Sequence, residues 1–304
     1  MERKRKGRPG RSARGPVKRS ESSGKGKGTK KKRAARTKAP ATAKREARRS
    51  ARRAPRRVPS RTERSEIRLN RFLAMAGVAS RRAGDELIRE GRVSVDGAIE
   101  TSPGRRVDPE SNEVKLDGRS LRIEQRRIYV LVNKPTGCVV TAADPQGRKT
   151  VLDLVPKLPA RVFPVGRLDL NSTGLVLLTN DGEVAERLGH PRYEIERVYR
   201  AKVSGSVSTE LLERLERGVT LDDGPARALR ARTVKRNQGS TVIELRVGEG
   251  RFHLVRRLMD AIGHPVRRLT RVSMGPLSLG ALPLGEARPL TMSEARSLRR
   301  ALGL

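Results

Sequence analysis

The first fifth of the chain carries nearly two thirds of its formal net charge, which confines any fold to the remainder. Residues 1–64 hold 27 basic and 4 acidic residues, so they contribute +23 of the +36 total. They contain no Phe, Tyr or Trp and few large aliphatic residues. Such a segment cannot bury enough apolar surface to offset the conformational entropy lost on folding. We therefore expect residues 1–64 to be a disordered basic tail.

The charge also indicates the class of partner. A net charge of +36 on 304 residues favours a polyanion, and nucleic acid comes first. A flexible basic tail that grips phosphates would bind less tightly as salt rises, because each contact releases counterions. The charge density favours this role over the alternative, a solubilising or targeting extension, although transit peptides are also basic and poor in acid. Composition leaves these alternatives open.

Cysteine, histidine and hydropathy exclude several other classes. The single cysteine, Cys138, excludes an intramolecular disulfide framework. The three histidines have no cysteine or carboxylate companions at ligand spacing, so we expect no metal site. No apolar run approaches the roughly 20 residues that cross a bilayer. We expect a cytoplasmic, monomeric protein without a membrane segment.

A small helical module is predicted directly after the tail. Apolar residues at helical spacing over residues 69–76 predict a short amphipathic helix, which Gly77 would end in a left-handed conformation. Ser80 is placed to cap a second helix over residues 81–90. Residues 93–97 then alternate between apolar and polar and end in Asp-Gly, a pair typical of two-residue hairpin turns.

The segment RLNRFLAMAGVASRRAGDELIREGRVSVDGAIE resembles the S4 RNA-binding domain over residues 68–117. We place this domain at residues 65–125. Arginine suits RNA because its planar donors match phosphate oxygens and can stack on unpaired bases. The alternative is that these arginines only form a solvated face. The resemblance implies five candidate RNA contacts: Arg68, Arg71, Arg81, Arg82 and Arg92.

The second unit, predicted at residues 126–304, contains a polar loop between apolar strands. Residues 128–132 form an apolar run that ends at the polar turn 133–137. A second predicted strand, residues 162–165, is separated from a third, residues 175–178, by the loop 166–174. This loop would present an arginine and an aspartate at the mouth of an apolar sheet, where partial desolvation strengthens charge interactions. A loop aspartate can also be merely a turn residue.

The motif GRLDLNSTGLVLLTNDG resembles the signature of RsuA and RluB type pseudouridine synthases. The motifs NKPTG, DPQGRKTVLDLVP, ERVYR and EGRFHLVRRLMD follow that family in order, so the resemblance covers nearly all of residues 68–291. It implies an α+β fold, in which a small S4 domain accompanies a catalytic domain with a largely antiparallel central sheet. The implied activity is conversion of uridine to pseudouridine in ribosomal RNA, free or in an assembling particle.

The motifs DPQGRKT and LDDGPARA are closer to the RluB branch, which favours large-subunit (23S) ribosomal RNA. A small-subunit substrate is one alternative. Another is a non-catalytic ribosome-assembly factor that binds ribosomal RNA through S4 and the tail. The presence of an aspartate, a tyrosine and an arginine at the family's catalytic positions argues against the assembly factor.

By resemblance, Asp169 is the catalytic carboxylate, Tyr199 holds the flipped base and Arg256 pairs with the aspartate. The reaction breaks the bond between N1 and C1′ and rejoins uracil through C5 without net redox change, so it demands no cofactor. A carboxylate suits a sugar carbon that develops cationic character. A neighbouring guanidinium would keep that carboxylate ionised.

Further positions carry two interpretations each. Tyr199 could instead be a core tyrosine of its strand. Lys134 and Arg167 would hold phosphates or fill the space left by the flipped base, or else form ion pairs that stabilise the fold. Arg257 is predicted to contact RNA or to be structural.

Overall fold

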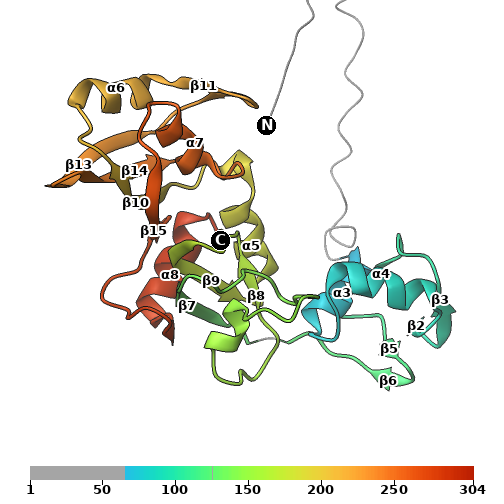
Figure 1. The fold of residues 1–304 in the computed structure, drawn as a ribbon. Helices are drawn as coiled ribbons and strands as arrows, with labels where there is room; N and C mark the ends of the chain where they lie inside the picture. Colours follow the sequence, from blue (N-terminus) through green and yellow to red (C-terminus); the bar gives the residue numbers. More distant parts are fainter. Residues whose placement is uncertain (1–65, 125) are drawn as a thin grey trace, which may run out of the picture. The chain divides into compact units, whose positions relative to one another are not determined.

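The computed structural model describes residues 66–124 and 126–304. The predicted tail, residues 1–64, lies outside the described residues. The predicted domain limits at residues 125 and 126 stay predictions (Figure 1).

Residues 66–124 form a helical pair and a small antiparallel sheet. Their strands pair in the order β3-β2-β5-β6, and β1 pairs separately with β4. Apolar side chains from both helices and from four strands form one buried core around Leu69, Leu73 and Ile88. The elements are β1 (Ile67–Arg68), α3 (Leu69–Met75), α4 (Arg81–Arg89), β2 (Val93–Val95), β3 (Ala98–Glu100), β4 (Arg106–Val107), β5 (Val114–Leu116) and β6 (Arg119–Ser120).

The local signals that predicted this module act in the structure as expected. The Ser80 hydroxyl accepts a hydrogen bond from the Ala83 amide at 3.1 Å, which caps α4. Gly77 follows the C-terminal end of α3 with a left-handed backbone, φ +79°. Asp96 and Gly97 both have positive φ, at 50° and 85°, as a type I′ hairpin turn requires. The two predicted helices and the hairpin are confirmed.

Residues 126–304 are built on one large mixed sheet. Seven of its nine strands follow the order β13-β14-β10-β15-β9-β7-β17, while β16 pairs with β15 and β8 with β9. Every pairing is antiparallel except that of β15 with β9, so the largely antiparallel sheet is confirmed. The strands are β7 (Tyr129–Lys134), β8 (Phe163–Val165), β9 (Ser172–Thr179), β10 (Arg197–Ser204), β13 (Arg230–Asn237), β14 (Ser240–Val247), β15 (Val266–Met274), β16 (Leu277–Ser278) and β17 (Ala287–Pro289).

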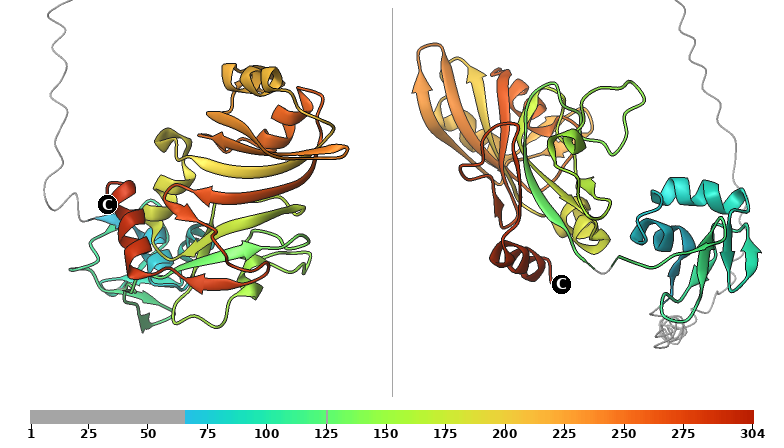
Figure 2. Two further views of the ribbon diagram at one scale, coloured as in Figure 1. Left: turned by 90° about the vertical axis from the view of Figure 1, so that its left-hand side faces the viewer. Right: turned by 90° about the horizontal axis from the view of Figure 1, so that it is seen from below.

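Helices cover the two ends of this sheet with separate cores (Figures 1 and 2). One core joins α6 (Thr209–Arg217) and α7 (Leu254–Asp260) to β10, β13 and β14. Another joins α5 (Gly182–Gly189) and α8 (Met292–Ala301) to β7 and β9. The remaining elements are the hairpin of β11 (Val219–Leu221) with β12 (Gly224–Ala226), and the short helices η1 (Val151–Leu154) and η2 (Pro191–Tyr193). No helix of the described residues is long and apolar enough to cross a membrane.

Two strands extend further than predicted toward the polar loop. Strand β7 continues through Lys134, which pairs with Gly174. Strand β9 begins at Ser172 instead of residue 175, so the polar loop is shorter than expected. Ser172 and Thr173 are buried because they pair in parallel with Leu269 and Thr270 of β15. That pairing fixes the loop before β9 beside the centre of the sheet.

Candidate active site

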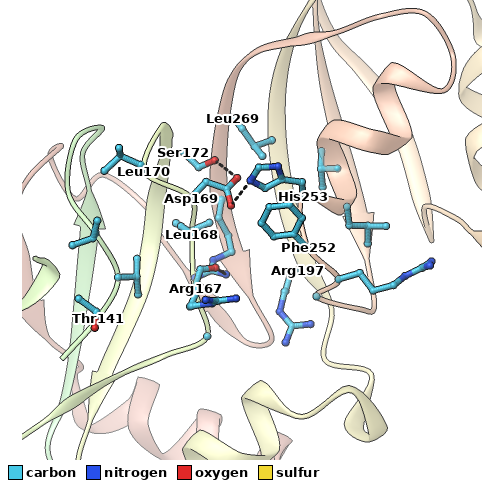
Figure 3. Close-up of a pocket in the computed structure, with 18 of the residues that line it drawn as sticks. Thr141, Arg167, Leu168, Asp169, Leu170, Ser172, Arg197, Phe252, His253 and Leu269 are labelled. Carbon is cyan, nitrogen blue, oxygen red and sulfur yellow. Dashed lines mark hydrogen bonds and ion pairs between the residues drawn. The ribbon is translucent and has the colours of Figure 1, made fainter. Parts of the chain in front are cut away.

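The loop between β8 and β9 opens onto a cavity of about 670 Å³. The cavity is lined by that loop, by β10 and β15, and by the turn that precedes α7. Asp169 projects from the loop into this space (Figure 3). Its own backbone carbonyl accepts a hydrogen bond from the Ser172 amide at 3.0 Å, which forms a tight turn directly before β9.

Three side chains converge on the Asp169 carboxylate. Arg256 Nε donates to Oδ2 at 3.4 Å, and the Ser172 hydroxyl donates to the same oxygen at 3.1 Å. His253 Nε2 lies 3.3 Å from Oδ1. Arg256 Nη2 also donates to the Ser172 hydroxyl at 3.2 Å, so these three residues form a closed network. The Asp169 side chain remains 32% exposed, which leaves the carboxylate open to a substrate.

The start of α7 sets the direction of Arg256. Val255, Leu258 and Met259 are buried in the core beneath this helix, so Arg256 is directed away from that core and toward Asp169. His253 directly precedes the helix and has a left-handed backbone, φ 51°. The structure therefore brings Asp169 and Arg256 together although they are 87 residues apart in the sequence.

Tyr199 lies in β10, half-buried, and also lines the cavity. It packs against apolar side chains of two neighbouring cores. The sequence suggested either a core tyrosine or a residue of the site, and Tyr199 is both packed in the core and exposed to the cavity. Core packing restrains the ring, and its position in the cavity wall leaves it accessible from the cavity.

The predicted phosphate contacts are placed very differently from one another. Arg167 is exposed at the cavity. Lys134 is fully buried, and its ammonium donates to the carbonyls of Pro135 at 2.8 Å and Leu170 at 3.2 Å. Burial lowers the pKa of Lys134. This geometry supports the structural interpretation of Lys134, because the ammonium links the end of β7 to the loop that carries Asp169.

Arg257 is engaged by a carboxylate. Its Nη1 lies 2.7 Å from Asp223 Oδ1, and its Nη2 donates to Oδ2 at 2.9 Å. Hydrogen bonding to Arg257 lowers the pKa of Asp223. The bidentate pair links α7 to the turn between β11 and β12, which favours a structural role for Arg257.

The candidate S4 contacts lie at or near the surface of residues 66–124. Arg81 and Arg82 are exposed in the first turn of α4, and Arg68 is also exposed. Arg71 is half-buried in α3. Arg92 is exposed but donates to Asp117 at 2.9 and 2.6 Å. Arg68, Arg81 and Arg82 are therefore the most accessible of the five.

The structure adds residues that the sequence did not single out. Ser172 and His253 touch Asp169, and each lies three positions from a predicted catalytic residue, a spacing that could have drawn notice. Arg271 is 2% exposed and lines the cavity, with Nε donating to the Leu175 carbonyl at 2.8 Å. Arg197 is also buried there and donates to the Ile195 and Leu188 carbonyls.

These two buried arginines have no carboxylate partner within salt-bridge distance among the described residues. Burial lowers the pKa of Arg197. Together with exposed Arg167 they place an excess of positive charge around the cavity. Such charge favours an anionic ligand. No group of three or more His, Cys, Asp and Glu side chains in the described parts could hold a metal ion.

Comparison with known proteins gives two family matches. Residues 128–261 match the RNA pseudouridylate synthase family, and residues 67–114 match the S4 domain. A crystal structure of a pseudouridylate synthase is similar with a TM-score of 0.54 and 29% identity, and the match covers 76% of this chain and 99% of that one.

Two bacterial relatives are similar over most of their length. An uncharacterized RNA pseudouridine synthase of Aquifex aeolicus is 46% identical over 241 residues, which are 79% of this chain and 96% of that protein. The ribosomal large subunit pseudouridine synthase B of Bacillus subtilis is 45% identical over 76% of this chain and 95% of its own length. The chain therefore belongs to the RNA pseudouridine synthase family and carries an S4 domain ahead of the synthase domain.

Proposed function

We propose that this protein isomerises uridine to pseudouridine in large-subunit ribosomal RNA, with Asp169 as the group that acts on the ribose. The observation that carries the proposal is the Asp169 carboxylate, held by Arg256 and Ser172 yet open to a cavity. The large-subunit substrate is supported by relatives named ribosomal large subunit pseudouridine synthase B in Bacillus subtilis and Pseudomonas aeruginosa, 45% and 42% identical.

The chemistry needs a negative oxygen beside C1′ while the bond to N1 breaks. Asp169 forms a glycosyl adduct or abstracts a ribose proton, and both roles require the ionised carboxylate. Arg256 stabilises that negative charge, and Ser172 fixes the orientation of the same oxygen. Uracil then turns and joins C1′ through C5, which releases Asp169 from the adduct or returns the abstracted proton to the ribose. The hydrogen at C5 leaves as a proton and N1 takes up a proton, so the product is an isomer of uridine.

The target uridine must leave its stack to reach Asp169. Tyr199 would hold the flipped base, and this role is supported by a ring that is restrained by the core and borders the cavity. Arg167 is the exposed cation at the same opening, where it would contact a phosphate or occupy the position vacated by the base. Lys134 and Arg257 are not proposed as RNA contacts. The Lys134 ammonium is buried and donates to two backbone carbonyls, and the Arg257 guanidinium is paired with Asp223.

Arg81 and Arg82 supply sequence-independent affinity through phosphates in this proposal. Both are exposed on α4, and within residues 66–124 and 126–304 no hydrogen bond or ion pair engages their side chains. The basic tail would add further phosphate contacts, with an affinity that falls as salt rises. The proposed substrate is ribosomal RNA, free or in an assembling particle.

A tritium-release assay tests the function. Ribosomal RNA transcripts labelled with tritium at C5 of uridine lose the label to water when C5 joins C1′. The purified protein is incubated with 23S transcript, with 16S transcript or with particles assembled on either labelled transcript, and released tritium is counted. Release from 23S alone is expected. Release from 16S alone would establish the small-subunit alternative, and RNA binding without release from either transcript or from assembling particles would favour the assembly factor.

A further inference from the structure

Phe252 is an exposed aromatic residue beside the catalytic carboxylate. Its side chain is 71% exposed, whereas Phe72 is buried and Phe163 is half-buried. Exposed apolar residues are common on protein surfaces, so exposure alone indicates nothing. Phe252, however, lines the same cavity as Asp169 (Figure 3). Its location at a site that receives a nucleotide is what calls for an explanation.

The Phe252 ring is held in a defined orientation. It stacks on the His253 ring, with centroids 3.8 Å apart and an interplanar angle of 16°. His253 in turn lies 3.3 Å from Asp169 Oδ1. An aromatic stack therefore begins at the carboxylate and ends at the phenyl ring. The exposed phenyl ring is available to a further planar group.

The turn that carries Phe252 is anchored on both sides. Arg251 donates to Glu249 at 2.9 Å, to the Pro225 carbonyl at 2.7 Å and to Asp223 at 3.0 Å. On the other side, His253 has a left-handed backbone, which is uncommon for a residue other than glycine. The surrounding contacts thus hold the phenyl ring at the cavity before any ligand arrives, which lowers the entropy cost of binding.

When a base flips out of its stack, the nucleotide beside it loses a stacking partner. An aromatic ring can replace that partner for any base, because every base has a π-face. We propose that Phe252 stacks on the nucleobase adjacent to the target uridine, and so stabilises the complex of the protein with its RNA. This inference rests on the proposed function. Tyr199 serves the flipped base itself, and Phe252 serves its neighbour.

Removal of the ring tests this role. Phe252→Ala is expected to raise the half-saturating RNA concentration about 5- to 150-fold, the range for loss of one stacked base. The maximal single-turnover rate stays at the wild-type value, and Phe252→Trp restores the affinity. Met292→Ala, which removes a side chain 77% exposed on α8, is the matched control and changes neither quantity. A purely structural role through His253 and Asp169 would lower the maximal rate instead and would overturn the proposal.

A fluorescent base locates the contact. The probe is a stem-loop RNA that contains the uridine modified by the wild-type protein, with 2-aminopurine at its 5′ or its 3′ neighbour. Binding is compared for Asp169→Asn and for Asp169→Asn with Phe252→Ala, so that no turnover occurs. One of the two probe positions should be more strongly quenched when Phe252 is present. The stacking role is refuted if the proteins with and without Phe252 give equal fluorescence at both probe positions, or if Phe252→Ala binds RNA with unchanged affinity. Tritium release by the wild type would then leave the proposed function intact. Absence of wild-type release would refute both.

Discussion

Replacement of Gly174 by alanine should damage the junction that positions the catalytic loop. Gly174 pairs with Lys134 on one side and with Arg271 on the other, where β9 runs parallel to β15. Its φ is +108°, which side chains of L-residues rarely adopt. An added Cβ would overlap the carbonyl oxygen of Arg271 and lie 2.7 Å from its amide nitrogen. The backbone of β15 cannot yield as the end of a flexible side chain would.

The expected cost combines strain with lost pairing. The left-handed backbone of an alanine costs roughly 1–2 kcal/mol. Relief of the overlap requires β9 and β15 to separate over the three residue pairs they share, which end at Gly174 and Arg271. Strain at a special φ together with disrupted backbone pairing brings the total to about 3–5 kcal/mol. For a domain of this size that lowers Tm by about 6–20 °C.

Thermal unfolding followed by circular dichroism measures the change. Gly182→Ala is the matched control, because Gly182 begins α5 with an ordinary φ and an added Cβ there meets no atom within 4 Å. That control should leave Tm unchanged or raise it slightly, since alanine favours the helix. If Gly174→Ala melted within about 2 °C of the wild type, about the smallest change expected for 1 kcal/mol, the close approach of β9 to β15 would be refuted.

Substitutions at three other sites test separate parts of the structure. Arg256→Met should lower the maximal rate of tritium release about 100-fold, because the positive charge beside Asp169 is lost. Arg256→Lys keeps that charge and should lower the rate less. Wild-type rates in both variants would show that the pairing of Arg256 with Asp169 does not contribute to catalysis. The double variant Arg81→Ala with Arg82→Ala should weaken binding of 23S RNA and reduce the salt dependence of that binding, without changing the rate in the bound complex. The control, Arg214→Ala with Arg217→Ala on α6, should leave binding unchanged. Equal affinities of the two double variants would refute the S4 role. Glu294 has its pKa lowered to about 2, chiefly by Arg288, so its ionised form stabilises α8 above about pH 4.5 and this contribution is lost as the pH falls toward 2. Since Glu294 is 31% exposed, Glu294→Gln should cost about 1–2 kcal/mol in urea unfolding at pH 7, and the difference should shrink between pH 5 and pH 3; a constant difference would contradict this coupling.

Local signals predicted the small module well and the edges of the catalytic strands poorly. Ser80, Gly77 and the Asp-Gly pair act within a few residues of themselves, so their consequences are readable from sequence. The predicted start of β9 at residue 175 was wrong because Ser172 and Thr173 are polar and were assigned to the loop. Their inclusion in the sheet depends on pairing with β15, almost a hundred residues further along the chain, which no local pattern reveals.

The site divides in a similar way. Motif resemblance identified Asp169 and Arg256, and the structure brings them to 3.4 Å. His253 escaped notice because a residue before a short helix gives no sign of its side-chain direction, which here depends on a left-handed backbone. Lys134 was expected to hold a phosphate, to fill the space left by the flipped base or to form an ion pair that stabilises the fold. Its full burial was not predicted, since lysine is rarely buried. The carbonyls of Pro135 and Leu170 explain how its ammonium is accommodated away from solvent.

The most direct measurement concerns the carboxylate itself. Asp169→Asn keeps the side-chain shape and removes the negative charge, and it is assayed under single-turnover conditions with 23S RNA and saturating protein. Asp260→Asn, an exposed aspartate at the end of α7, is the control and should release tritium at the wild-type rate. We expect Asp169→Asn to bind the RNA with wild-type affinity and to release no tritium. Release at the wild-type rate from Asp169→Asn would contradict the assignment of the chemistry to this residue.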